Sequence, residues 1–251
     1  RITFEAVLSL GAGAVALVAA GTLLTIACGV LVARLAGYPT TFGLLTGGAV
    51  GICGASAALA IAAVLPESRK GAQDTVFAVI AVTTLSTLAM IFYPVAAEAL
   101  GLGDGSTGLF LGGTIHDVAQ VVGAGYSVST DAGDTATITK LVRVAMLVPV
   151  VFTISLAFGG RSDGRPAWPL PPFVLAFCGL VAVNSAGWIP GSVANLLETM
   201  SSWFLVAAIA GLGIKTSLGQ LGRLGAGPVA LVVTESLFLA GWVLGGVGWL
   251  V

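Results

Sequence analysis

The chain has 251 residues, of which 57% are hydrophobic and only 8% are charged, and its formal net charge is −1. Because globular domains carry about 25% charged residues, this composition predicts a membrane protein that crosses the bilayer several times. The near-neutral charge excludes a basic face for nucleic acid. The three cysteines are scattered without the spacing of a disulfide framework or a metal site, so we expect no cofactor and no metal.

Long uncharged runs divide the chain into about eight helical membrane segments. Each is long enough to span a bilayer, and a membrane β-barrel lacks such runs, so the fold class is all-α. The segments are expected at residues 10–33, 43–66, 75–97, 108–125, 136–158, 169–188, 193–214 and 224–251. A polar acidic loop is expected at residues 126–135.

Two pairs of similar segments suggest that the fold contains an internal duplication. Residues 10–18 (LGAGAVALV) match residues 224–232 (LGAGPVALV) at eight of nine positions, and GLLTGG at 43–48 resembles GLFLGG at 108–113. One interpretation is a transporter whose glycine-interrupted segments meet near the membrane midplane. The alternative is chance, because a chain rich in Gly, Ala, Leu and Val matches itself easily.

The polar residues His116, Asp117 and Gln120 lie within the apolar segment at 108–125, and His116 is the only histidine. Ionisable groups at membrane depth indicate a functional site. We expect Gly112 and Gly113 to break the helix just before them, which would expose amides that attract an anion. The alternative is a histidine that only fixes helix packing through a backbone carbonyl.

Residues 51–56 form the expected partner of this polar group. Gly51, Cys53 and Gly54 let another backbone approach closely, and Ser56 adds a hydroxyl that can bind a polar ligand. A tight helix crossing without any ligand is the alternative.

Lys140 and Arg143 share one face of the segment at 136–158. They are candidates to neutralise Asp117 or an anionic substrate, or else they extend to the membrane interface. Glu198 and Glu235 are left open as proton or sodium sites.

The charge pattern leaves the path of residues 108–125 undecided. If this stretch crosses the membrane, the arginines at 161 and 165 and the basic residues 215 and 223 face outward, against the positive-inside rule. If it dips in and returns, they face inward and the acidic loop faces outward. Paired repeats favour the full crossing, so both paths remain open.

Four stretches resemble the YeiH-type family of bacterial membrane proteins, which are described as sulfate exporters. They are ICGASAALAIAA (52–63), GGTIHDVAQVVGAGYSVS (112–129, which includes Thr114), TKLVRVAMLVP (139–149) and AIAGLGIKTSLGQLGRLGAGPVALV (208–232). The resemblance covers essentially the whole chain, treated as one transporter domain, and implies further helices before Arg1. It also implies kinship with the bile acid/sodium symporter-like superfamily, whose core contains two broken, crossing helices.

The sequence therefore predicts a secondary transporter for a small anion, such as sulfate, sulfite or an organosulfonate, in the bacterial inner membrane. Its site would lie between the two broken segments, with coupling to H⁺ or Na⁺ and the formation of a homo-oligomer left open. The rival is a membrane-embedded enzyme that uses Cys53 and His116, which requires the two side chains within hydrogen-bond reach. No enzyme motif supports it, so we expect no catalytic activity.

Overall fold

The computed structural model describes residues 10–66, 71–158 and 225–250, with single residues between 179 and 207. Within these ranges the regular elements are α-helices, as the composition predicts. The expected segments at 169–188 and 193–214, together with Glu198, lie outside the continuous described ranges.

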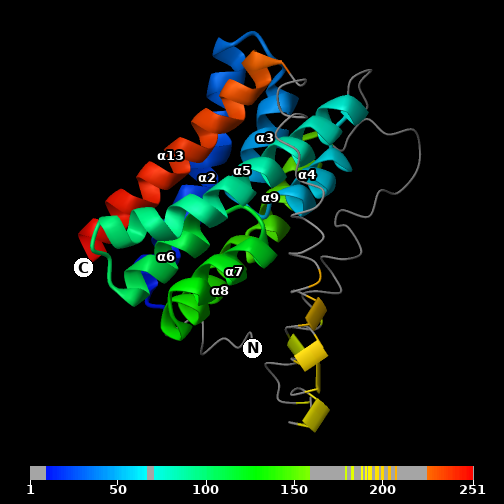
Figure 1. Cartoon of the computed structure of the whole chain (residues 1–251). Coiled ribbons are helices and arrows are strands. Elements are labelled where there is room, and N and C mark those ends of the chain that lie inside the picture. The colour runs from blue at the N-terminus through cyan, green and yellow to red at the C-terminus, as the bar shows by residue number, and fades with distance from the viewer. Residues whose placement is uncertain are drawn as a thin grey trace.

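Within the described ranges, four helical stretches are long and apolar enough to cross a membrane. They are α2 (Ala12–Leu35), α5 (Gly71–Ala99), α13 (Ala226–Leu250), and α8 (Thr130–Ala145) continued by α9 (Leu147–Phe158). Helices α2 and α13 run side by side (Figure 1), and the indole of Trp242 donates a hydrogen bond to the Leu17 carbonyl at 3.0 Å. These helices form the frame that holds the shorter elements.

The first glycine-rich segment is a helical hairpin made of α3 (Thr40–Gly51) and α4 (Ala55–Ala62). Gly54 supplies the turn, because its φ of +64° lies in the left-handed region that only glycine adopts without strain. Gly48 of α3 lies against Ile61 of α4, so the chain folds back on itself after the turn. We call residues 52–54 the first tip.

The second segment is also a hairpin, made of α6 (Asp104–Thr114) and α7 (Val118–Val128). Its open end is closed by Ser129, whose hydroxyl donates to the Asp104 carboxylate at 2.8 Å. Gly108 of α6 and Gly125 of α7 both pack against Ala132, which places the two arms side by side on α8. We call residues 115–117 the second tip.

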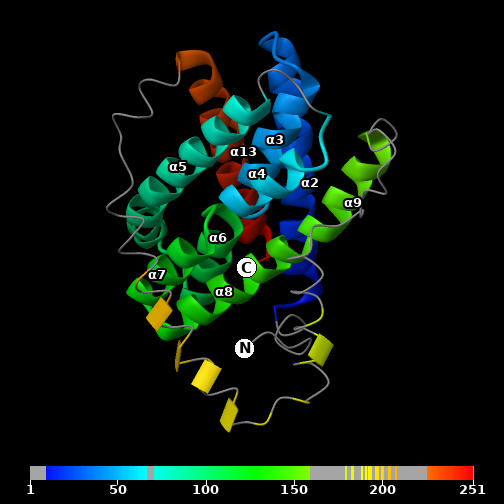
Figure 2. The ribbon, with the colours of Figure 1, turned by 90° about the vertical axis from the view of Figure 1, so that its right-hand side faces the viewer.

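The two hairpins enter the molecule from opposite ends. The 29-residue helix α5 begins beside the open end of the first hairpin and finishes at the start of the second, as the two views show (Figures 1 and 2). An arm of 11 residues rises about 16 Å, roughly half of a bilayer core of about 30 Å. Residues 108–125 therefore follow the second of the two expected paths: the chain enters as α6, turns at the second tip and returns as α7. The expectation of crossing helices was wrong.

Two local expectations also need correction. Gly112 and Gly113 do not break the helix, because α6 continues to Thr114 and the break falls at residues 115–117. Their role is close packing: a Cβ on Gly112 would collide with the Ala136 carbonyl of α8. The expected acidic loop at 126–135 is helical on both sides of Ser129, whose hydroxyl caps α8 by accepting from the Ala132 amide at 3.1 Å.

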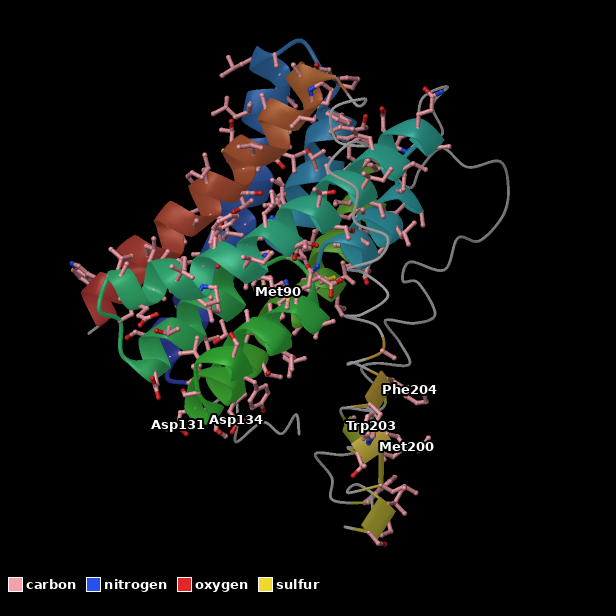
Figure 3. All side chains as sticks on the ribbon, in the orientation of Figure 1. Met90, Asp131, Asp134, Met200, Trp203 and Phe204 are labelled. Atoms are coloured by element: carbon pink, nitrogen blue, oxygen red, sulfur yellow. The ribbon has the colours of Figure 1, made fainter. Side chains whose placement is uncertain are left out.

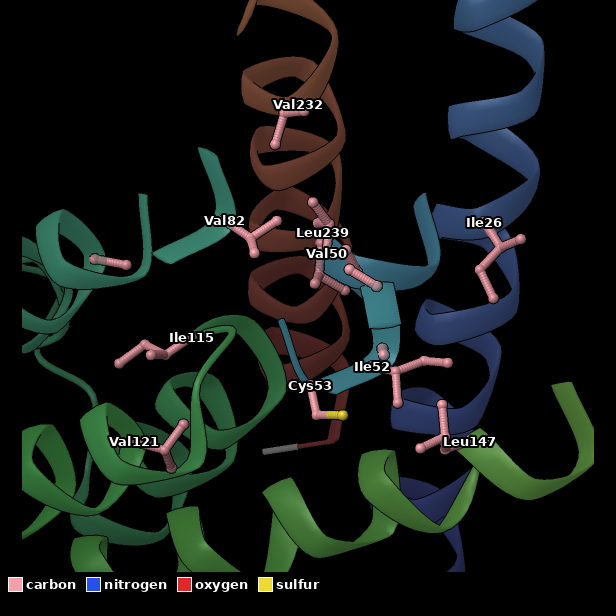
Figure 4. Close-up of a cluster of buried hydrophobic side chains, with 14 of the residues drawn as sticks. Ile26, Val50, Ile52, Cys53, Val82, Ile115, Val121, Leu147, Val232 and Leu239 are labelled. Carbon is pink, nitrogen blue, oxygen red and sulfur yellow. The ribbon is translucent and has the colours of Figure 1, made fainter. Parts of the chain in front are cut away.

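Apolar side chains fill the space around both tips. Figure 4 shows Ile52 and Cys53 of the first tip and Ile115 of the second tip among the buried residues of this cluster. Ile52 and Ile115 are fully buried. Polar groups at the tips therefore need partners from the protein itself.

Candidate functional site

The backbones of the two tips meet near the middle of the fold. A Cβ placed on Gly54 would lie 3.5 Å from the carbonyl oxygen of His116 and 3.7 Å from its Cβ. These are ordinary van der Waals distances, so the backbones of the two tips pack directly against each other. The two stretches that the sequence paired, 51–56 and 112–120, are therefore neighbours.

Two buried cations of α8 hold the tips together. The Lys140 ammonium donates to the carbonyls of Ile52 at 2.7 Å and Ile115 at 3.0 Å, one in each hairpin. The Arg143 guanidinium donates to Val50, Gly51, Gly112 and Ile115, at distances from 2.6 to 3.3 Å. Both side chains are fully buried, so they do not extend to the membrane interface.

These contacts determine the electrostatics of the site. The carbonyls that receive the cations end α3 and α6, where the helix dipole is negative. The same tips hold the first residues of α4 and α7, where the dipole is positive and the first amides lack intrahelical partners. The cations offset the negative ends of α3 and α6, and the Asp117 carboxylate offsets the positive end of α7, so the positive end of α4 is left without an offsetting charge.

The His116 ring contacts α13 through its Nε2 atom. Its Nε2 lies 2.9 Å from the Ser236 hydroxyl, which donates its own proton to the Val232 carbonyl at 2.9 Å. Nε2 must therefore carry a proton and donate it to Ser236. Nδ1 is buried, and no hydrogen bond to it of good geometry is seen within the described residues.

Asp117 and Gln120 are anchored to α5. The Asp117 carboxylate caps α7 by accepting from the Ala119 amide at 2.9 Å, and its own amide donates to the Ser86 hydroxyl at 3.0 Å. The Gln120 amide nitrogen donates to the Thr87 hydroxyl at 2.8 Å. Gln120 Oε1 is buried with no partner within the described ranges. The second hairpin thus presents an unpartnered acceptor on Gln120.

The open side of the tips lies at the starts of α4 and α7. Ser56 is exposed and Asp117 is half-buried, whereas His116, Gln120 and the cations are buried. Helix α7 begins at its own carboxylate, whereas α4 begins at Gly54 and has no acidic residue in its first turn. An external anion therefore meets less repulsion at the start of α4 than at the start of α7.

The remaining predicted residues take different places. Cys53 is buried at the first tip, and Thr114 donates its hydroxyl to the Phe110 carbonyl within α6. His116 bonds Ser236, and no hydrogen bond joins it to Cys53 among the described residues. The thiol–histidine pairing that an enzyme would require is not seen.

Sequence reasoning missed the partners that come from distant helices. Ser86 and Thr87 of α5 and Ser236 of α13 lie in apolar runs, where lone hydroxyls give no signal of contact. Glu235 was considered but not assigned; it is fully buried, and its Oε1 lies 2.8 Å from the Thr46 hydroxyl of α3.

The fold and these contacts define an all-α membrane protein, which in its described ranges has four long apolar helices around two helical hairpins. The family model described as Conserved hypothetical protein 698 matches residues 1–232. The chain belongs to this family, the YeiH-type UPF0324 membrane proteins.

Relatives in this family match nearly the whole chain. A UPF0324 membrane protein of Chlorobaculum tepidum is 52% identical over 100% of this chain and 71% of its own length. The UPF0324 membrane proteins TauZ of Paracoccus pantotrophus and Paracoccus denitrificans are 51% and 52% identical, over 98% and 97% of this chain and 74% and 73% of theirs. No solved structure matches the chain.

Proposed function

We propose that this protein is a secondary transporter of a small anion, with its substrate site where the tips of the two hairpins meet. The observation that carries the proposal is the pair of buried cations, Lys140 and Arg143, whose hydrogen bonds all go to backbone carbonyls. Asp117 is the carboxylate within electrostatic reach of Lys140, so among the described residues these two buried cations share one negative charge, which is costly. A bound anion would supply the missing negative charge.

The anionic group would bind at the start of α4. The free amides of Ala55 and Ser56 and the Ser56 hydroxyl are donors, and a helix N-terminus favours negative charge. Lys140 and Arg143 would act through their field rather than by direct contact, because most of their donors are already used. Gly51, Gly54, Gly112 and Gly113 would permit the close packing that keeps the tips together.

The substrate class follows from the groups beside this position. Sulfate, sulfite and organosulfonates are small anions whose oxygens accept hydrogen bonds from amides and hydroxyls. The name TauZ of two relatives hints at taurine or another sulfonate. An aminosulfonate also carries an ammonium group, which the Asp117 carboxylate and Gln120 Oε1 would accept. We therefore favour an aminosulfonate over inorganic sulfate.

The membrane arrangement belongs to the same proposal. The protein would lie in the bacterial inner membrane, with the two hairpins dipping from opposite faces as an inverted repeat. Arg34 would face the cytoplasm, and Glu98, Asp104, Asp131 and Asp134 would face outward. Figure 3 shows Asp131 and Asp134 close together at one end of the bundle.

The test is transport by the full chain in proteoliposomes. Uptake of labelled taurine, sulfite and sulfate should be measured for the wild type, Ser56→Ala and His116→Ala. We expect saturable taurine uptake that both substitutions lower, with Glu98→Gln as an exposed control that leaves it unchanged. No uptake of any of these anions by the wild type would refute the proposal. Full uptake by His116→Ala would remove His116 from the site.

A further inference from the structure

Glu235 is a buried carboxyl group that the proposed substrate site does not use. It lies on α13, is fully buried, and faces α2 and α3. Oε1 lies 2.8 Å from the Thr46 hydroxyl, and Oε2 has no hydrogen-bond partner within the part of the chain that the structure describes. An ionised carboxylate in this position would have one hydrogen bond for its whole charge, which is very costly in an apolar interior.

The hydrogen-bond geometry around Thr46 indicates the protonation state. The Thr46 hydroxyl lies 3.1 Å from the Phe42 carbonyl and 2.8 Å from Glu235 Oε1, but it has only one proton to donate. If Glu235 is ionised, two acceptors compete for that proton. If Glu235 carries a proton on Oε1, it donates to Thr46, and Thr46 donates to Phe42. Only the neutral acid satisfies both contacts.

Within the described ranges, no basic side chain forms an ion pair with Glu235. Helix α2 carries Cys28, which is within electrostatic reach of Glu235, and the exposed Arg34 in its last turn, whereas neither α3 nor the rest of α13 contains a titratable residue. The neighbouring helices α6 and α5 carry titratable residues at other levels, namely Asp104, Asp74, Tyr93 and Glu98. On the other side, His116 contacts Ser236, the residue that follows Glu235.

The packing also disfavours a metal ion at this carboxyl. A Cβ on Gly29 of α2 would collide with Glu235 Oε1, so the backbone of α2 already occupies that side. Sodium and other hard cations need several oxygen ligands. Among the described residues no group of three acidic, His or Cys side chains is placed to hold a metal.

We propose that Glu235, with Thr46, is a proton-binding site separate from the anion site, and that it makes H⁺ the coupling ion. The coupling part rests on the proposed transport function, whereas proton binding does not. The proton is held between α13 and α3, the helix that leads into the first tip. Its release leaves a carboxylate that must reach water or a donor, so α3 and α13 have to move relative to each other. Ser236 links the same turn of α13 to His116.

Infrared difference spectroscopy of the full chain in lipid nanodiscs tests proton binding directly. We expect a carbonyl band of a protonated carboxylic acid that is lost in Glu235→Gln and unchanged in Glu98→Gln. Thr46→Val removes the hydroxyl that accepts the hydrogen bond from the protonated Glu235, so it should shift the same band. A band that is unchanged in both Glu235→Gln and Thr46→Val would overturn the proposal, as would its loss on adding Na⁺ at constant pH.

Transport distinguishes failure of this inference from failure of the proposed function. In proteoliposomes, an imposed pH gradient should change taurine uptake by the wild type and by Glu98→Gln but not by Glu235→Gln. If Glu235→Gln responds to the gradient like the wild type, Glu235 is not the coupling site. If no variant transports any anion while the infrared band still depends on Glu235, the transport proposal fails and the proton site stands.

Discussion

The side chains of Lys140 and Arg143 donate most of their hydrogen bonds to backbone carbonyls. They lie one turn apart on α8, and together they reach carbonyls at the ends of both α3 and α6. A cation at the C-terminal end of a helix stabilises it, and here two helix ends share the same pair. The pair therefore fixes how the tips meet, in addition to setting the charge of the site.

Replacing Lys140 should destabilise the fold. Lys140→Met removes the donor for the Ile52 carbonyl and one of the donors for Ile115. A buried acceptor left unpaired costs about 1–3 kcal/mol. Thermal unfolding of the detergent-solubilised protein should show this loss as a lower midpoint.

The matched control for this change is Arg34→Met. Arg34 is exposed at the end of α2 and contacts only the Thr40 hydroxyl among the hydrogen bonds of the described chain. The thermal unfolding midpoint of Arg34→Met should stay near that of the wild type. Equal midpoints for Lys140→Met and the wild type would show that the tips do not depend on Lys140.

Asp117 should separate aminosulfonates from simple anions. Asp117→Asn keeps an N-cap, because Asn and Asp cap equally well, but removes the charge. Losing one charged hydrogen bond should raise the KM for taurine by about tenfold or more. Uptake of sulfite should not fall, since it has no ammonium group. A parallel loss for both substrates would place Asp117 in the structure of the hairpin rather than in substrate choice.

Some of these residue roles were visible in the sequence and others were not. The cost of burying His116 and Asp117 in an apolar run was enough to mark them. The spacing of Lys140 and Arg143 placed them on one helix face, but nothing in the sequence identified backbone carbonyls from two other elements as their acceptors. Ser236 and Thr46 were beyond prediction, because they meet His116 and Glu235 only through long-range packing.

At the scale of elements, hydropathy located the long helices but not the hairpins. The expected spans at 10–33 and 75–97 correspond to α2 and α5 within a few residues. A glycine-rich apolar run, however, is equally compatible with a chain that continues and one that turns back. The observation that favoured a returning path for 108–125 was the charge pattern, which puts the basic loops inside only if this stretch dips in and returns.

The glycines of α6 should control how closely the second hairpin packs on α8. Gly112→Ala introduces a Cβ that collides with the Ala136 carbonyl, so the helices must separate. Overpacking of this kind costs about 1–3 kcal/mol. Gly245→Ala on α13 is the matched control, since its Cβ meets no atom within 4 Å. We expect that control to gain up to about 1 kcal/mol from the better helix propensity of alanine. Thermal midpoints that fall equally for both variants would contradict the packing role.

At the scale of the whole molecule, the two hairpins make a centre that neither could make alone. Each brings one negative and one positive helix end to its tip, and α8 offsets both negative ends. Because the hairpins enter from opposite ends, the centre lies about half-way through the fold. Under the proposed function, a site at that depth would be reached from either side as one hairpin moves, which is the geometric requirement of alternating access.

Cysteine labelling of intact cells tests this arrangement of the chain. In a background without the native cysteines, Ala36→Cys, Leu100→Cys and Thr130→Cys place single thiols at exposed positions at the ends of helices. We expect a membrane-impermeant maleimide to label residues 100 and 130 from outside, and residue 36 only after the membrane is opened. Residues 100 and 130 flank the second hairpin, so a stretch that returns puts them on one side. A stretch that crosses puts them on opposite sides, so labelling of residue 100 without residue 130 would contradict the hairpin.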